Sequence, residues 1–547
     1  MNLIEQIKQA FHSHLQTIFE QSDLAEYNFD LNTDPAKEQF GDINTNAAMI
    51  LAKQLKKNPR EIAQKIADSF SNEHIEKLEV AGPGFLNLYL SPTAFKTLMT
   101  QLVEAQEQFF TLSKDHPKKN FNIEFVSANP TGPLHLGHGR GGIIGDVLAN
   151  ILQFLGHKAT REYYINDAGA QIQKLAKSFK VRCQQAAGMD VTMPEDGYQG
   201  QYLVDLAKVA LSELGKEILE KPEEFFGQYA KVHMLDQLKK TLQDYGITFD
   251  VWFSEKSLHE KGAVDAAFKI LEKNGFLYEK DGALWFRSTE FKDDKDRVVR
   301  KSSGDLTYVA SDIAYMEDKT ERDFDPMIMI LGHDHHSYGV RLEGLRQALG
   351  LKAKLQIIFY QLVKMKASGE LVRMSKRTGN IVTLEGVIDT VGTDVARFFY
   401  LNRKADAQLE FDLDLALKKT EENPVYYVQY ALVRTKSILA KAKEENGLEV
   451  IEKKDVQHLA DAERFLIKKM VSLKQLLENI SHNYHTHLLT YYVIELANAF
   501  HSYYSKNRVI DQENLEQSKA RLLLINQLKN TFELCLTLLG ISRPDRM

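Results

Sequence analysis

Two short segments of the chain carry side chains suited to ATP phosphates. The first, residues 128–138, ends in the turn His135-Leu136-Gly137-His138. The second is the basic loop Arg373-Met374-Ser375-Lys376-Arg377, more than two hundred residues later. Histidine N–H groups and a lysine ammonium can stabilise negative charge that develops on phosphorus and on departing pyrophosphate, which is electrostatic stabilisation rather than general-base catalysis. Residue types and spacing therefore indicate chemistry on a nucleotide.

The elements around the first segment place it well for phosphate binding. Residues 122–126 have the pattern of a strand, and residues 143–152 have the apolar spacing of a helix that ends near Gly156. A helix N-terminus offers unpaired N–H groups and partial positive charge to an anion, and the glycines of the turn would let a nucleotide approach the backbone. Two alternatives remain open. One is an ordinary strand–helix connection; the other is a metal site formed by His135, His138, His333, Asp334, His335 and His336.

Two further segments follow predicted strands. The polar run Gly332-His333-Asp334-His335-His336 comes directly after the apolar residues 327–331, at a strand end where adenosine could be held, or where a plain polar loop could lie. The basic loop follows a strand at 361–365 and precedes a helix from Leu384. Glycines on either side would let the loop close over ATP, with Lys376 on pyrophosphate. A solvated basic turn is the alternative.

Composition and charge describe an ordinary soluble globular protein. Hydrophobic residues make up 44% of the chain and charged residues 26%, which is typical of globular proteins. The length of 547 residues predicts three or four domains. The two cysteines, Cys183 and Cys535, cannot form a disulfide framework, which suits a reducing cytoplasm. No apolar run is long enough for a membrane span. The net charge of −6 is not typical of a nucleic-acid-binding protein, although residues 424–547 are slightly basic and the remainder is acidic.

The chain divides into four regions. Residues 1–112 begin with helices and end in a strand–turn–strand pattern at 78–90. A polar linker follows at 113–120. Residues 118–385 alternate strands and helices, which predicts a Rossmann-like parallel sheet with strands at 122–126, 159–165, 327–331 and 356–362. A mostly helical insertion at about 168–290 interrupts this alternation, and residues 386–547 are nearly all helical.

The two motifs together resemble the signatures of class I aminoacyl-tRNA synthetases. Over its whole length the chain is similar to bacterial arginyl-tRNA synthetases, on the stretches 40–48, 163–169, 305–314 and 423–431 and on the ending Arg546-Met547. The first motif has Leu136 where isoleucine is common, and the second has Arg373 and Arg377 where lysine and serine are usual, but Lys376 is kept. The resemblance implies an α/β Rossmann-like catalytic core with a helical insertion, an α+β N-terminal module that touches the tRNA elbow, and an all-α anticodon-binding domain from about residue 424.

The resemblance also implies the residues of the active site. His135, His138 and Lys376 would be catalytic. ATP would be bound by Pro133, Gly137, His138, Gly332, Asp334, His336, Met374, Ser375 and Lys376, and arginine by Glu124, Ser127, Asn129, His138, Tyr308 and Asp312. Carboxylates hold a guanidinium in bidentate geometry, so Glu124 and Asp312 are expected at its guanidinium and α-amino ends in an order left open. Such a pocket rejects other amino acids without an editing domain.

For tRNA, the resemblance implies contacts from both ends of the chain. Phe85 would stack on an unpaired D-loop base that Asn87 reads, and Tyr426, Arg508 and Met547 would lie near the anticodon. Aromatic residues at helical spacing in the C-terminal region are more often core than base platforms, and core packing is equally open for Phe85.

The expected partners are tRNA-Arg, L-arginine and ATP with Mg²⁺, in a cytoplasmic monomer without a structural metal or membrane contact. Two other functions are weighed. An adenylyl-transferring enzyme acting on a small molecule needs no helical domain at 386–547, and a non-catalytic tRNA binder need not keep His135, His138 and Lys376. The resemblance implies as well that activation of arginine requires bound tRNA.

Overall fold

The N-terminal module is an antiparallel sheet packed against helices. The computed structural model describes residues 1–113, 115–371, 382–448 and 452–547. Helices α1 (Leu3–Phe19), α2 (Ala47–Leu55) and α3 (Pro59–Ser69) accompany strands β1 (Phe29–Leu31), β2 (Ile43–Thr45), β3 (Ile75–Ala81) and β4 (Phe85–Leu90). The strand order is β1-β2-β4-β3. The strand–turn–strand pattern expected at 78–90 is confirmed as β3 and β4, which pair antiparallel.

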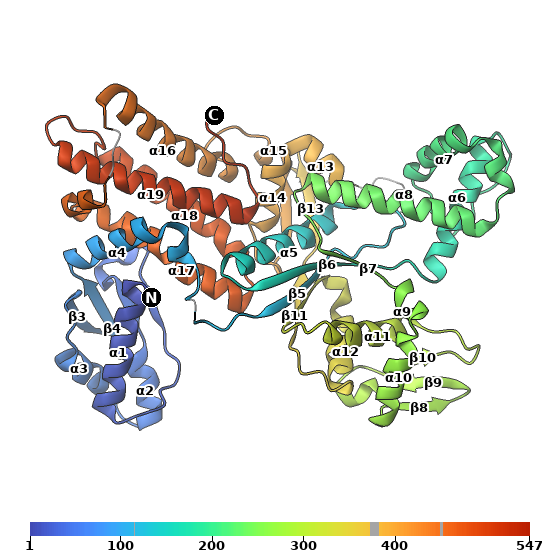
Figure 1. Ribbon diagram of the computed structural model, residues 1–547, viewed down its shortest axis with the longest axis horizontal. Helices are drawn as coiled ribbons and strands as arrows, with labels where there is room; N and C mark the ends of the chain where they lie inside the picture. Colours follow the sequence, from blue (N-terminus) through green and yellow to red (C-terminus); the bar gives the residue numbers. More distant parts are fainter. Residues whose placement is uncertain (114, 372–381, 449–451) are drawn as a thin grey trace.

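The centre of the molecule is a five-stranded parallel sheet (Figure 1). Its order is β12-β11-β5-β6-β7, formed by β5 (Asn120–Phe125), β6 (Lys158–Ile165), β7 (Val251–Ser254), β11 (Met327–Gly332) and β12 (Leu355–Tyr360). Helices α5 (Leu136–Phe154), α11 (Tyr308–Glu321) and α12 (His336–Ala348) connect or precede these strands. The four strands expected from the sequence are confirmed within two residues at their ends. Because the strands are parallel, their carboxyl ends meet at one edge, where ligands bind in such sheets.

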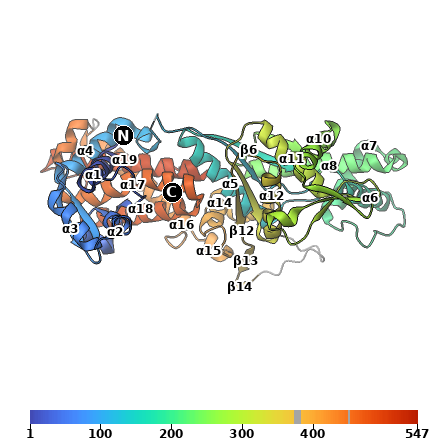
Figure 2. The same ribbon diagram turned by 90° about the horizontal axis from the view of Figure 1, so that it is seen from below.

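The insertion is all-helical in its first part and mixed in its second. Helices α6 (Ala170–Ala186), α7 (Gln201–Leu214) and α8 (Glu223–Asp244) form the first part, and in both ribbon views they lie at the opposite end of the molecule from the N-terminal module (Figures 1 and 2). After Asp244 the helical expectation needs correction. β7 joins the core sheet, and β8 (Leu277–Lys280), β9 (Ala283–Phe286) and β10 (Arg297–Arg300) form a separate antiparallel sheet beside α10 (Ala263–Lys273). Strands of four residues are too short to give a readable alternation.

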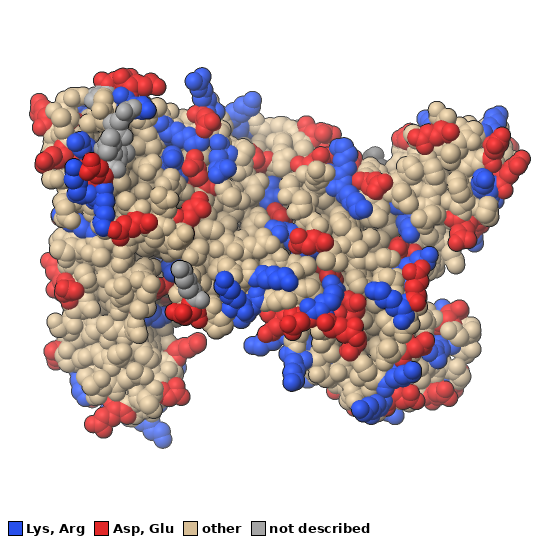
Figure 3. All heavy atoms as spheres, in the orientation of Figure 1, with Lys and Arg blue, Asp and Glu red and all other residues tan. Residues whose placement is uncertain are grey.

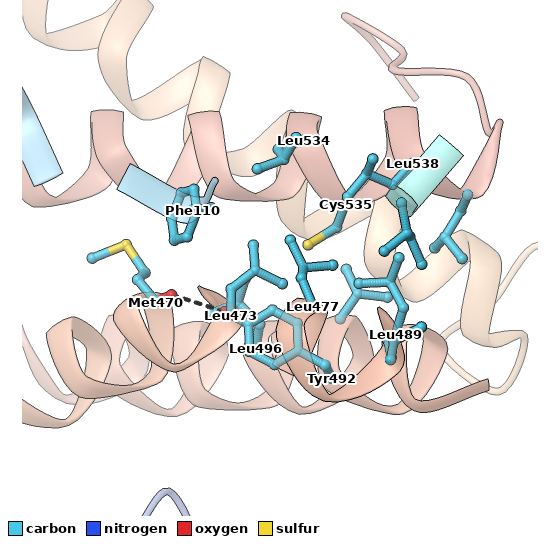
Figure 4. Packing of buried hydrophobic residues seen from close by; sticks show 14 of the residues in the cluster. Phe110, Met470, Leu473, Leu477, Leu489, Tyr492, Leu496, Leu534, Cys535 and Leu538 are labelled. Atoms are coloured by element: carbon cyan, nitrogen blue, oxygen red, sulfur yellow. Dashed lines mark hydrogen bonds between the residues drawn. The ribbon is translucent and has the colours of Figure 1, made fainter. Parts of the chain in front are cut away.

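The segment after the core sheet is mixed before it becomes helical. β13 (Val363–Ala367) pairs with β14 (Glu370–Leu371) and with β15 (Leu409–Asp412), and α13 (Leu384–Val391) and α14 (Thr393–Leu401) lie between them in sequence. The long helices are α16 (Pro424–Asn446), α17 (Arg464–Asn483), α18 (His487–Lys506) and α19 (Leu515–Leu539). Leucines of α17, α18 and α19 interdigitate around Tyr492 and Cys535 (Figure 4). Both cysteines are free and buried.

The N-terminal module rests on the helical domain. Helix α4 (Pro92–Ala105) packs against α17. Two lysines of α17 form ion pairs with the N-terminal module: Lys468 Nζ lies 2.8 Å from Asp42 Oδ1, and Lys474 Nζ lies 2.9 Å from Glu5 Oε1. These links join the first hundred residues to the last hundred, so both tRNA-contacting regions expected from the sequence belong to one side of the molecule (Figure 1). Within the ranges described, no helix is both long and apolar enough to cross a membrane.

Candidate functional site

The chain leaves β5 through a strained turn. Val126 and Ser127 have φ values of 66° and 40°, a region that a β-branched residue such as valine rarely adopts. Ser127 Oγ donates to Glu124 Oε1 at 3.2 Å and accepts from the Tyr164 backbone N–H at 3.1 Å. Backbone strain of this kind persists where the surroundings over-determine it, commonly at ligand sites. The turn fixes Glu124 at the carboxyl end of the sheet.

The two histidines of the first motif cap the helix that follows it. The Gly137 N–H donates to His135 Nδ1 at 3.1 Å, and the His135 N–H donates to His138 Nδ1 at 3.2 Å. The two rings stack with centroids 3.7 Å apart. Since both Nδ1 atoms accept a hydrogen bond, each neutral ring carries its proton on Nε2. The site thus combines two histidine N–H donors with the positive end of α5, as phosphate binding requires.

Three glycines of α5 that follow the motif serve packing. A Cβ at Gly141 would lie 2.7 Å from the Tyr360 ring, and one at Gly145 would lie 2.3 Å from the Phe125 ring. A Cβ at Gly139 would meet the Leu384 side chain at 2.5 Å. These residues let α5 approach the sheet closely. Gly137 differs, because its neighbour is only the ring of His135, so its expected role toward ATP stays a prediction.

The chain returns from the second motif directly onto the first. Met374, Ser375 and Lys376 lie outside the described residues. The Leu136 N–H donates to the Val382 carbonyl at 3.1 Å, and the Leu384 N–H donates to the Leu134 carbonyl at 2.8 Å. A short antiparallel contact therefore joins the exit of the basic loop to the histidine turn. Their separation of more than two hundred residues in sequence disappears in the fold.

The segment 332–336 also lies at this edge. Gly332 ends β11, and Asp334 and His336 are exposed, with the His336 ring stacked on Phe359 at 4.9 Å. Pro133 is half-buried in the turn before His135. The insertion reaches the same turn, because Tyr202 of α7 donates to the Thr131 carbonyl at 2.6 Å. In the part of the chain that the structure covers, no three His, Cys, Asp or Glu side chains gather in a way that would hold a metal ion.

Among the described residues, two carboxyl groups near Glu124, the half-buried Asp312 and the buried Glu255, form no ion pair. Asp312 of α11 accepts from the Tyr338 hydroxyl at 2.7 Å. Its burial, together with the nearby negative charges of Glu255 and Glu124, raises the pKa of Asp312 to about 7, although Tyr338 and Arg341 oppose the shift. Burial also raises the pKa of Glu255. Hydroxyls of Ser311 and Tyr164 lie close enough to favour its ionised form, yet Glu255 Oε2 has no hydrogen-bond partner in the described structure.

Glu124 differs from these two because it has a cation. Lys319 Nζ donates to Glu124 Oε2 at 2.6 Å. Sequence reasoning missed both Lys319 and Glu255. A signal existed for each: Glu255 directly follows β7 at the carboxyl edge of the sheet, and Lys319 lies seven residues after Asp312 on the same face of an apolar helix.

The remaining residues expected to bind arginine lie on the two segments that carry Glu124 and Asp312. Tyr308 is the first residue of α11, one helical turn before Asp312, and 55% of its surface is exposed. Asn129 is half-buried two residues after Ser127. The fold therefore brings Glu124, Ser127 and Asn129 together on one segment and Tyr308 and Asp312 together on another.

The residues expected to bind tRNA lie apart from the residues expected to bind arginine. Phe85 is 41% exposed at the start of β4, which excludes core packing for it, whereas Asn87 is 6% exposed and offers little of its amide to a ligand. Tyr426 of α16 stacks with Tyr430, over which the Arg434 guanidinium lies at 4.7 Å.

Arg508 and Met547 lie beyond this aromatic row. Arg434 also lies 5.3 Å from the exposed ring of Tyr504, and Tyr504 lines a surface pocket with Arg508. Met547 is 50% exposed, at the end of a tail that Lys436 of α16 holds through the Pro544 carbonyl at 3.2 Å. On the face shown in Figure 3, acidic and basic side chains are interspersed.

Three family models match the chain. They are the arginyl tRNA synthetase N terminal domain at residues 3–90, the catalytic domain of class I (R) tRNA synthetases at 99–406, and the DALR anticodon binding domain at 428–547. The arginine–tRNA ligase of Bacillus velezensis is 41% identical, with 100% of each chain covered, and that of Citrifermentans bemidjiense is 44% identical, with 94% of each covered. The arginyl-tRNA synthetase of Thermus thermophilus shares the fold, with a TM-score of 0.77 at 20% identity over 100% of each chain. The chain therefore belongs to the arginyl-tRNA synthetases, the class I enzymes that join arginine to its tRNA.

Proposed function

We propose that this arginine–tRNA ligase holds the guanidinium group of arginine between Asp312 and Glu255. The observation that carries this assignment is that neither carboxyl group forms an ion pair among the described residues, one having a pKa raised to about 7 and the other an orphaned oxygen. A guanidinium offers two parallel N–H donors and a charge that cannot be lost, so it satisfies both groups at once. Lysine offers only a point charge, which supports discrimination by orders of magnitude.

The other end of arginine is assigned to the strained turn after β5. Glu124, through the oxygen that also accepts from Ser127, would receive the α-ammonium group, and Asn129 would orient the carboxylate. Tyr308 would cover the pocket from the start of α11. This arrangement directs the carboxylate towards His138 and the N-terminus of α5, where the α-phosphate of ATP would lie.

Activation then follows from the charges at this edge. A carboxylate oxygen of arginine attacks the α-phosphorus of ATP, and the bond to pyrophosphate breaks. The Nε2–H groups of His135 and His138 stabilise the added negative charge, and Lys376, with Met374 and Ser375 beside it, stabilises the departing pyrophosphate. Pro133, Gly137, Gly332, Asp334 and His336 would hold the rest of the nucleotide. Mg²⁺ arrives with ATP as part of the substrate. A hydroxyl at the 3′ end of tRNA-Arg then takes the arginyl group, and AMP leaves.

The tRNA contacts are assigned to two surfaces. Phe85 would stack on an elbow base with Asn87 beneath it, and the row of rings from Tyr426 to Tyr504, with Arg508 and Met547, would receive anticodon bases. The domain limits that go with this proposal are 1–112, 118–385 with the insertion at about 168–290, and 386–547 with the anticodon domain from about 424. The enzyme would act as a monomer in the cytoplasm.

The test is ATP–pyrophosphate exchange with each amino acid, with and without tRNA-Arg. We expect exchange with arginine only, and only when tRNA is bound. Comparable exchange with lysine or a neutral amino acid would overturn the pocket assignment. Full exchange with arginine in the absence of tRNA would overturn the tRNA requirement and leave the pocket assignment in place.

A further inference from the structure

A fully buried lysine lies next to the proposed arginine pocket. Lys319 is 0% exposed, and its Nζ donates to Glu124 Oε2 at 2.6 Å and to Asn122 Oδ1 at 2.8 Å. It also lies 3.8 Å from Glu162 Oε1 and 4.6 Å from the ring centre of Tyr315. A buried ammonium is costly unless every partner is in place. Its position therefore depends on the carboxylates around it.

The two carboxylates closest to Lys319 each have a cation beside them. Glu162 is completely buried and receives both terminal nitrogens of Arg322, one at 2.5 Å and one at 3.0 Å. Lys319 and Arg322 thus carry two positive charges against the carboxylates of Glu124, Glu162 and Asp318, whose Oδ2 lies 2.8 Å from Arg322 Nε. Glu124 and Glu162 therefore each have a cation beside them, whereas Asp312 and Glu255 form no ion pair among the described residues.

We propose that Lys319 is a positioning residue of the arginine pocket: it occupies the cation site beside Glu124 and thereby directs arginine's guanidinium to Asp312 and Glu255. This inference rests on the pocket proposed above. By holding Oε2, Lys319 leaves Oε1 of Glu124, beside Ser127, as the oxygen available to substrate. Without Lys319, the pocket would contain a third uncompensated carboxylate and a vacancy of the size of an alkylammonium ion.

The placement of Lys319 on its helix supports a role in the pocket rather than in folding alone. Asp312, Tyr315 and Lys319 follow one another at helical spacing on α11, and all three face the carboxyl ends of β5 and β6. One face of α11 therefore carries both Asp312, which forms no ion pair in the described residues, and Lys319, which pairs with Glu124. A shift of either group would change the charge that the other experiences.

The experiment is chemical rescue of Lys319→Ala in the full-length enzyme. We expect the arginine KM in tRNA charging to rise roughly 10- to 100-fold, the scale of a lost charged hydrogen bond, while the KM for ATP changes little. Added ethylammonium or propylammonium should fill the vacancy and restore the arginine KM, whereas propanol, which has the length without the charge, should not. A folded variant with an unchanged arginine KM, or one that no alkylammonium ion rescues, would overturn the proposal.

A second variant covers the case in which Lys319→Ala does not fold. Lys319→Gln keeps a hydrogen-bond donor on a side chain one atom shorter but loses the charge. Asp312 faces Glu124, Glu255, Tyr338 and Arg341, so an uncompensated Glu124 should move the pH midpoint of arginine affinity upward, and an unchanged midpoint would contradict the inference.

Two controls separate the possible failures. Lys468→Ala removes another buried lysine, paired with Asp42 at 2.8 Å far from the pocket, and should lower stability without raising the arginine KM. Asp312→Asn tests the pocket itself. If Asp312→Asn loses arginine binding while both Lys319 variants behave as the wild type, the inference about Lys319 fails and the proposed pocket stands.

Discussion

Two buried groups of charged residues in the catalytic domain differ in whether their charges are matched. On the far side of α5, Asp146 accepts from Arg397 at 2.6 Å and from Arg161 at 3.3 Å. Arg397 also donates to the Leu539 carbonyl at 2.9 Å and to the Tyr245 carbonyl at 2.7 Å. In the proposed arginine pocket, Glu255 is equally buried and Asp312 is half-buried, and neither forms an ion pair among the described residues. Similar residue types thus give two different arrangements.

The difference separates architecture from binding. Arg397 joins four segments: its own helix α14, the motif-bearing helix α5, the carboxyl end of α8 at Tyr245, and the last turn of α19. Its matched charges hold the catalytic and helical domains together. Asp312 and Glu255 make no such ion pairs in the free protein: Asp312 accepts a hydrogen bond from Tyr338, and a cationic ligand would balance the charge of both carboxylates. Burial alone therefore does not identify a site; burial without a partner does.

The largest expected effect is on substrate use by Asp312→Asn. Removing one partner of a buried charge pair costs about 2–5 kcal/mol, so kcat/KM for arginine should fall roughly 30- to 5,000-fold. Stability should not fall. Because the folded protein raises the pKa of Asp312, ionisation costs folding free energy as the pH rises from about 4 to about 7, and asparagine removes that cost. Urea unfolding at pH 8 without ligand checks this.

The matched control for that variant is Glu321→Gln, an exposed acid at the end of the same helix. It should change neither kcat/KM nor the urea midpoint. A large loss of stability in Asp312→Asn would mean that this carboxylate supports the fold, and the contrast with Asp146 would then disappear.

Arg397→Met should show the opposite pattern. The variant leaves Asp146 with one partner and two buried carbonyls without a donor, which should cost about 3–5 kcal/mol of stability. Amide hydrogen exchange should accelerate in α5 and in the last turn of α19, while the arginine KM stays near the wild-type value in enzyme that remains folded. Arg403→Met, which changes an exposed arginine two residues after α14, is the control. Unaltered exchange rates in both helices would contradict the architectural role.

Lys376→Ala tests whether this lysine stabilises charge that is already present in bound ATP or charge that develops only in the transition state. Because Lys376 is proposed to stabilise the departing pyrophosphate, the variant's kcat should fall by about 10²-fold or more, while the KM values for ATP and arginine change little. Lys364→Ala, an exposed lysine on β13, should leave kcat unchanged. An effect confined to the KM for ATP would assign Lys376 to uniform binding instead.

Local patterns in the sequence predicted the elements, and the resemblance predicted the residues of the site. The strand–turn–helix around His135 was readable because periodicity changes at the turn. The short strands β7 to β10 were not, because four residues carry too little pattern. A different reason explains why Lys319, Glu255 and Arg397 were missed. The role of each depends on contacts with residues that are tens to hundreds of positions away in the sequence. The reciprocal cap of His135 and His138, and the packing role of Gly139, Gly141 and Gly145, likewise required coordinates.

Proton release on arginine binding tests the central claim most directly. If the guanidinium binds Asp312 in its ionised form, the bound carboxyl must lose the proton that it carries below its pKa of about 7. Calorimetric titration with arginine, in buffers of different ionisation enthalpy, should find about half a proton released per arginine at pH 7, nearly one at about pH 6 and almost none at about pH 8. Arginine affinity should fall about tenfold per pH unit below pH 7. Binding at pH 6 without proton release would contradict the account, because the carboxylates would then be ionised, and matched, before arginine arrives.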